Sequence, residues 1–209
     1  MEGLKQCLNI ALFEIHRHLA RKRILIMIVV LILSTILPTI VRYALNIPYP
    51  TEPKDFLAQD LGGVDTVIIL AATFFAGDAL VSEYEKRTGY ILFPNPVRRE
   101  IIYVGKFIAS FSVSYVFVLC YYLVKMVEVF AVYNTLPSEA VTSLAYATLY
   151  LLAVTGLAYI FNMIFRGSMA ATLVTFFTLF MILPVIQAIL VFSKIEPWFI
   201  ITYASEIIV

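Results

Sequence analysis

Long apolar runs separated by short polar intervals dominate the chain after residue 23. The runs that predict membrane spans are residues 24–41, 64–81, 101–124, 140–165 and 167–193. A helix needs about 20 apolar residues to cross the roughly 30 Å hydrocarbon core of a bilayer. The last two runs exceed that length and only Arg166 separates them, so they predict a tight helical hairpin.

Charged residues near the ends of these runs are compatible with membrane crossing. Asp65 and Asp78 bracket the apolar centre of the second run, and about 20 Å of helix would separate them. Each is expected near a different interface rather than at the costly midplane. Lys106 lies inside the third run, where its long side chain is expected to reach the headgroups. The interval that follows, with Lys125 and Glu128, is expected to form a polar turn.

Residues 1–23 have a different pattern, with Leu4, Leu8 and Leu12 recurring at helical spacing. Charged and polar side chains fall largely elsewhere on the helical wheel, which predicts an amphipathic helix lying in the headgroup plane. The same periodicity is compatible with a soluble helix that packs on a partner. No small-residue cleavage site of the kind found in secretory signals follows the basic cluster at residues 21–23.

The composition assigns the chain to the membrane proteins. It is 62% hydrophobic and 14% charged, whereas soluble domains average about 45–50% apolar and about 25% charged residues. The fold class predicted is all-α, a polytopic integral membrane helical bundle in which residues 1–209 form a single transmembrane domain. The two cysteines, Cys7 and Cys120, provide neither a disulfide framework nor a Cys-x-x-Cys site.

The distribution of basic residues predicts the orientation. With five spans, eleven Lys and Arg residues fall on the side of the N-terminus and four on the other side. The positive-inside rule then places the N-terminus and the interval between the second and third spans in the cytoplasm.

Motifs for catalysis or metal binding are not apparent in the sequence. The Gly105-Lys106 pair has Glu100 where the leading glycine of a phosphate-binding loop would stand, so no nucleotide cofactor is expected in this chain. His16 and His18 would face different sides of a helix, which disfavours a metal site. An aspartyl protease dyad of Asp65 and Asp78 is disfavoured because two such carboxylates must lie within a few ångströms. The sequence therefore predicts no catalytic, cofactor-binding or metal-binding residues.

The longest polar interval between two spans, residues 82–106, contains an apolar patch at residues 90–93. Exposed apolar clusters surrounded by charge usually mark a partner surface. An amphipathic stretch on the bilayer has the same composition and is the alternative. Two glutamates precede the patch, and a proline turn and basic residues follow it: Glu83, Glu85, Gly89, Pro96-Val97, Arg98-Arg99 and Gly105-Lys106.

This series resembles the cytoplasmic loop of ATP-binding-cassette (ABC) type-2 permeases, which are membrane subunits of exporters driven by separate ATPase subunits. The resemblance extends more weakly over the chain: an elbow helix, a first span, an external loop and a later hairpin follow in the expected order. The family typically has six spans with both termini cytoplasmic, whereas five are predicted here. Either a sixth helix is missing, or residues 205–209 begin it.

The resemblance implies a permease of the plasma membrane that uses residues 82–100 as its coupling loop. Its implied partners are two ABC ATPase subunits, which would hold ATP and Mg, a second permease chain of the same or a related kind, and the lipid bilayer, with no nucleic acid. The residues implied in ATPase coupling are Glu83, Glu85, Lys86, Arg87, Gly89, Tyr90, Ile91, Leu92, Phe93, Pro94 and Pro96.

Polar residues within the spans are candidates for a substrate pathway. These are Ser110, Ser114, Asn162 and Gln187. Such groups more often hold helices together than bind substrate. The substrate itself is not indicated, and the alternative function is a membrane scaffold or channel-like subunit that docks a cytoplasmic partner without transport.

Overall fold

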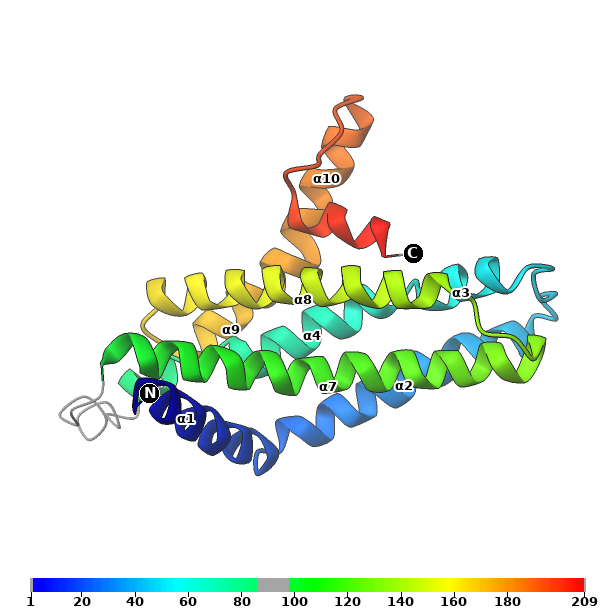
Figure 1. The fold of residues 1–209 in the computed structure, drawn as a ribbon. Coiled ribbons are helices and arrows are strands. Elements are labelled where there is room, and N and C mark those ends of the chain that lie inside the picture. Colours follow the sequence, from blue (N-terminus) through cyan, green and yellow to red (C-terminus); the bar gives the residue numbers. More distant parts are fainter. Residues whose placement is uncertain (1, 86–97, 209) are drawn as a thin grey trace.

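The computed structural model describes residues 2–85 and 98–208. The chain begins with the amphipathic helix α1 (Glu2–Leu19), and after a short turn α2 (Arg23–Ala44) leaves at an angle (Figure 1). Leu4 and Leu8, on the apolar side of α1, are exposed. This exposure is consistent with a helix whose apolar face lies in the membrane interface.

The second membrane segment is built from three helices. These are α3 (Pro53–Leu61), α4 (Val64–Ala76) and α5 (Val81–Glu85). Residues 53–61 precede the predicted second span and form a helix, in which Pro53 occupies the first turn, where a missing N–H costs nothing. A turn at residues 77–80 separates α4 from α5.

The next two helices are long. Helix α7 spans Arg99–Tyr133 and ends at Asn134, which adopts a left-handed conformation with φ 55°. Helix α8 spans Glu139–Ile164. The expected polar turn around Lys125 and Glu128 is wrong, since both residues lie within α7. Residues 106–133 contain no glycine or proline, so nothing local ends the helix before Asn134.

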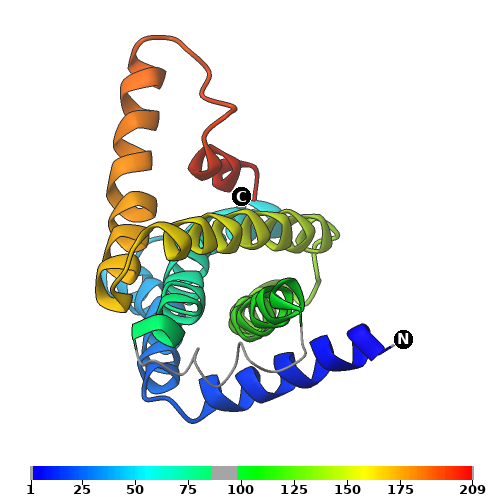
Figure 2. The same cartoon turned by 90° about the vertical axis from the view of Figure 1, so that its left-hand side faces the viewer.

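The last long helix is interrupted near its middle. It consists of α9 (Ser168–Phe177), the π-helical segment η1 (Thr178–Ile182) and α10 (Leu183–Phe192). Pro184 is the second residue of α10, just after η1, and a proline has no backbone N–H to donate to the preceding turn, so the wider turn relieves that position. Helix α10 leans away from the bundle, and the 3-10 helix η2 (Ile201–Ile207) folds back against α8 and α10 (Figures 1 and 2).

Helix α4 lies at the centre, packed against α7 and α8. In the most apolar window of residues 53–83, 78% of the window is buried within the chain. The corresponding share is 11% for α2 and for residues 168–192. Five helical segments of the described residues are long and apolar enough to cross a membrane. The predicted class, an all-α membrane bundle, is confirmed.

Candidate functional site

Four charged side chains meet at the end of the bundle from which residues 86–97 depart. We call Glu14, Arg17, Glu83 and Lys106 the loop-end cluster. The carboxylate of Glu83 accepts hydrogen bonds from Arg17 and, at 3.0 Å, from Lys106. Glu14 lies 3.3 Å from Arg17 and 3.2 Å from Lys106. Each carboxylate therefore contacts both cations, and the cluster joins α1, α5 and α7.

Lys106 does not reach the headgroups as expected. It is 3% exposed and is enclosed by the two carboxylates. The adjacent Gly105 explains how α1 comes so close, because a Cβ there would lie 3.1 Å from the backbone oxygen of Cys7 and 3.0 Å from Ile10. The Gly-Lys pair thus combines a close helix crossing with a buried cation.

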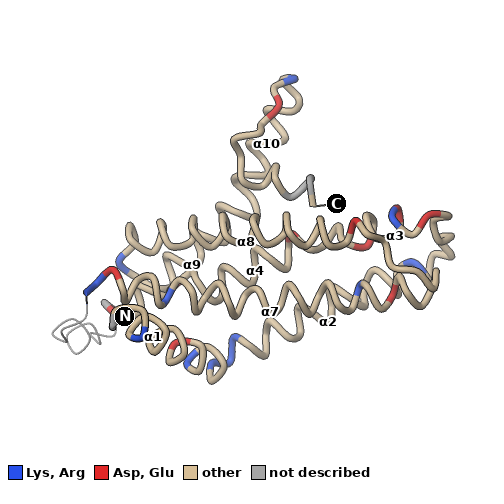
Figure 3. Tube along the Cα trace, viewed as in Figure 1, with Lys and Arg blue, Asp and Glu red and all other residues tan. Residues whose placement is uncertain are grey.

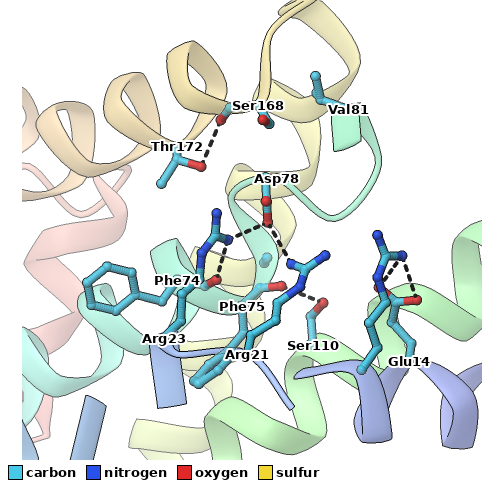
Figure 4. Close-up of polar contacts among 12 residues, drawn as sticks. Glu14, Arg21, Arg23, Phe74, Phe75, Asp78, Val81, Ser110, Ser168 and Thr172 are labelled. Carbon is cyan, nitrogen blue, oxygen red and sulfur yellow. Dashed lines mark hydrogen bonds and ion pairs between the residues drawn. The ribbon is translucent and has the colours of Figure 1, made fainter. Parts of the chain in front are cut away.

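Asp78 forms a second ion pair at this end, in the turn after α4. Its carboxylate accepts a hydrogen bond from Arg23 at 2.7 Å and lies 3.6 Å from Arg21 (Figure 4). Arg23 also donates to the backbone oxygen of Phe74 at 3.1 Å. The basic cluster between α1 and α2 therefore closes over the end of α4.

His18 lies between these two groups of charges and is 1% exposed. Neither ring nitrogen has a hydrogen-bond partner among the described residues. The ring packs edge-on against Phe75, with the ring centroids 5.6 Å apart. Burial lowers the pKa of His18 to about 4, so the ring is neutral at physiological pH.

Glu85 faces a different neighbour from Glu83. Its carboxylate accepts hydrogen bonds from the hydroxyl of Ser168 and, at 2.9 Å, from the backbone N–H of Ser168. Ser168 is the first residue of α9, where N–H groups lack partners within the helix and a carboxylate is favourable. The two glutamates of α5 thus attach it to opposite parts of the bundle.

Of the four candidate pathway residues, Ser110 and Asn162 both bond to the end of α4, Ser114 lies one turn after Ser110, and Gln187 lies elsewhere. Asn162 donates to the backbone oxygens of Ala76 and Ala158 and accepts from the N–H groups of Leu80 and Val81. It therefore holds the turn between α4 and α5. Ser110 donates to the backbone oxygen of Phe75 at 2.9 Å (Figure 4) and contacts Tyr159, while Ser114 is buried in α7. Gln187 lines a cleft beside α10.

A second group of charges lies toward the other end of α7. We call Asp60, Lys125 and Glu128 the far-end cluster. Lys125 is fully buried and donates to Asp60 at 3.1 Å, to Glu128 at 2.8 Å and to the backbone oxygen of Thr35 at 3.1 Å. The hydroxyl of Thr39 donates to Glu128. One lysine thus connects α2, α3 and α7.

The two clusters have the separation that a bilayer requires. Along α7 the helical rise places Lys106 and Lys125 about 28 Å apart, close to the roughly 30 Å of a hydrocarbon core. Uncharged residues fill most of the bundle between them (Figure 3). Fold and charge placement together define a polytopic helical membrane protein.

Comparison with known families identifies its kind. A family model described as ABC-2 family transporter protein matches residues 49–199, which is most of the chain. The chain belongs to this family, and the resemblance noted in the sequence is confirmed. Such proteins are permease subunits of ABC transporters and normally carry no ATPase site of their own. No curated protein matches the chain.

Much of the predicted coupling surface lies outside the described residues. These positions are Lys86, Arg87, Gly89, Tyr90, Ile91, Leu92, Phe93, Pro94 and Pro96. Glu83 and Glu85 are described, and their opposite attachments were not predicted. Glu14, His18 and Asp78 were not assigned to the site either. Their signal in the sequence was the occurrence of acids as well as bases at span ends on the side richest in Lys and Arg.

Proposed function

We propose that this chain is the permease subunit of an ATP-driven exporter and that energy enters through residues 82–100. Two separate ATPase subunits would hold the ATP and Mg, and a second permease chain, the same or related, would complete the pathway. Family membership supports a permease that works with ABC ATPase subunits. The loop and the direction of transport belong to the proposal.

The observation that carries the proposal is the divided attachment of α5. Glu83 contacts α1 and α7 through Arg17 and Lys106, while Glu85 contacts the start of α9 through Ser168. A partner that displaced the following loop would act on three helices through one short helix. Such transmission requires contacts that differ between two states and a rigid connection to the elements that move.

The orientation follows from the same end of the molecule. Basic residues of α1, the start of α2, the start of α7 and the turn before α9 gather there: Lys5, Arg17, Arg21, Lys22, Arg23, Arg98, Arg99, Lys106 and Arg166. The opposite end of the bundle has Arg42 of α2, Lys54 of α3 and Lys125 of α7. By the positive-inside rule, the loop end would face the cytoplasm of a plasma-membrane protein, where an ATPase can reach it.

The test separates docking from transmission. We would co-express the chain with its ATPase, purify the complex by a tag on the permease, and measure co-purification and ATPase activity in lipid nanodiscs. Serine at residues 90–93 should abolish co-purification. Glu83→Gln together with Glu85→Gln should retain the ATPase but reduce its permease-dependent activity about tenfold, the low end of known couplings between sites.

Glu139→Gln is the matched control, because Glu139 is an exposed acid in the first turn of α8 and lies outside residues 82–100. This variant should behave like the unmodified complex. If both sets of changes leave co-purification and activity intact, the coupling proposal is wrong. Failure of any ATPase to co-purify with the unmodified chain would favour a scaffold or channel-like subunit.

A further inference from the structure

A cleft of about 420 Å³ lies between α4, α8, α10 and η2. Its polar lining consists of Asp65, Tyr150, Gln187 and Thr202. Thr202 donates a hydrogen bond to the side-chain oxygen of Gln187 at 2.9 Å, which ties η2 to α10 on one side of the cleft. The folding back of η2 against α8 and α10 (Figures 1 and 2) therefore forms one wall of the cleft.

Asp65 supplies a negative charge to this cleft. One carboxylate oxygen accepts a hydrogen bond from the backbone N–H of Thr66 at 2.6 Å and contacts its hydroxyl at 3.3 Å. No Lys or Arg among the described residues lies within ion-pair distance of Asp65. By contrast, Asp78 and each carboxylate of the two clusters has a Lys or Arg partner. An ionisable residue within a membrane segment and without a counter-charge indicates a functional site.

Tyr150 gives a second and independent sign of a ligand. The residue lines the cleft and is 3% exposed, yet its hydroxyl has no hydrogen-bond partner among the described residues. Along α8 it lies about 16 Å from Glu139 and about 21 Å from Ile164, well inside the span. Buried tyrosine hydroxyls usually find a partner, so this oxygen is available to a group that enters the cleft.

The position of Asp65 in the first turn of α4 has a simpler explanation that accounts for part of these observations. Acids are favourable there because they face the positive end of the helix dipole. That effect explains why an acid is tolerated at this position. It does not explain why a tyrosine hydroxyl buried in the same cleft lacks a partner.

The remaining walls and the size of the cleft indicate what kind of cation would fit. Ile69, Pro184, Val191 and Phe192 line it with apolar surface. Cavities of this volume are typical of small organic ligands, whereas hard metal ions require six or more oxygen ligands. Among the described residues no three His, Cys, Asp or Glu side chains converge. A single carboxylate within apolar walls matches an ammonium or guanidinium group attached to an apolar body.

We propose that this cleft binds amphiphilic organic cations, with Asp65 as the counter-ion and the Tyr150 hydroxyl as a hydrogen-bond partner of the cationic group. As the substrate class of the exporter, the assignment rests on the proposed function. As a binding site it can be tested on the chain alone.

The probe is monodansylcadaverine, a primary amine whose dansyl group becomes more fluorescent in apolar surroundings. The full chain is placed in phosphatidylcholine nanodiscs, and empty nanodiscs give the background from lipid. The comparison ligand is N-acetyl monodansylcadaverine, which keeps the apolar body and removes the charge. The amine should bind saturably and at least about tenfold more tightly than its acetylated form, since a half-buried carboxylate without a counter-charge favours a cation.

Two variants locate the site. Asp65→Asn keeps an oxygen for the Thr66 N–H but removes the charge, and should weaken amine binding about tenfold or more. Tyr150→Phe should weaken it about three- to tenfold through the lost hydrogen bond. Glu52→Gln is the matched control, because this exposed acid lies just before α3 and outside the cleft. It should leave binding unchanged.

Three outcomes would overturn the proposal. These are equal binding of the amine and its acetylated form, unchanged amine binding by Asp65→Asn, and displacement of the amine by sodium chloride but not by choline chloride, which would assign the site to a small metal ion. The comparison of the two ligands uses the unmodified chain, so it stands even if a variant does not fold.

The experiment is also independent of the coupling proposal, because it needs neither ATP nor an ATPase. Amine binding that depends on Asp65, together with loss of the coupling result, would retain the site and reject the exporter. Intact coupling without amine binding would retain the exporter and reject the substrate class.

Discussion

The two charge clusters are built differently although both are buried at the ends of the same long helix. In the loop-end cluster each of two carboxylates contacts each of two cations, so the charges form a closed ring. In the far-end cluster Lys125 alone joins two carboxylates. Removing one member of the ring leaves every remaining charge with a partner. Removal of Lys125 leaves two acids with none.

This difference matches what each end has to do in the proposed mechanism. One lysine that binds two carboxylates suits an end where α2, α3 and α7 stay fixed relative to one another. A ring suits an end where α5 has to shift, because a carboxylate can change its distance to one cation while keeping the other. The contrast leads to predictions about stability that do not depend on the identity of the substrate.

The largest effect is expected for Lys125→Met. The change leaves the buried Asp60 and the half-buried Glu128 as neighbouring like charges without a cation, and breaking a buried ion pair from one side costs about 3–5 kcal/mol. Thermal unfolding of the purified chain in detergent should show a correspondingly lower midpoint. Lys54→Met, which removes an exposed lysine of α3, is the control. Equal unfolding midpoints for the two variants would show that the ion pairs of Lys125 do not stabilise the chain.

Glu83→Gln should have a smaller effect on stability, about 1–2 kcal/mol, because Arg17 and Lys106 keep Glu14 as a partner. A double-mutant cycle with Lys106→Met should give a coupling energy of about 1–3 kcal/mol between the two positions. A coupling energy near zero would mean that the ring contributes nothing. A loss larger than that of Lys125→Met would reverse the comparison.

These expectations also show where the sequence was informative. The apolar runs are long enough that hydropathy alone predicted an all-α membrane bundle, and the resemblance of the loop residues to those of ABC type-2 permeases indicated the family. Lys106 and Lys125 were interpreted wrongly, as a side chain reaching the headgroups and as part of a turn. Hydropathy considers one segment at a time, whereas both lysines are stabilised by acids on other helices.

The same reason explains the unpredicted parts of the candidate site. The pattern of Glu83 and Glu85 could be recognised, but which neighbour each contacts depends on the packing of α1 and α9 against α5. Asn162 was a candidate pathway residue because it is polar within a span. Three of its bonds hold the turn after α4, and that turn was not visible in the hydropathy pattern.

A separate effect, which appears only on acidification, concerns His18. His18 has its pKa lowered from 6.5 to about 4 by burial, with Glu14 raising it and Arg21 lowering it to lesser extents. At pH 7 the ring is neutral in both the folded and the unfolded chain. Below about pH 6.5 only the unfolded chain takes up the proton, so stability is lost as the pH falls toward 4. At pH 4.5 the loss should be about 2–3 kcal/mol.

The measurement is thermal unfolding of the chain and of His18→Leu between pH 7 and pH 4.5. All other ionisable groups are the same in both proteins, so the difference between them isolates His18. The variant should lose less stability over this range. Parallel curves would show that His18 is accessible to protons in the folded chain, and the packing of the loop end would then be looser than that of the far end.

The smallest effect is expected at the other attachment of α5. Ser168→Ala removes the hydroxyl that donates to Glu85 and keeps the backbone N–H that also donates to it. The loss of stability should be about 0.5–1 kcal/mol, as for other helix caps. Ser193→Ala is the control, because its exposed hydroxyl bonds only within its own helix. Thermal unfolding should place Ser168→Ala between this control and Glu83→Gln. If Ser168→Ala were instead more destabilising than Glu83→Gln, α9 would be the main attachment of the loop, and the ring at α1 and α7 would be secondary.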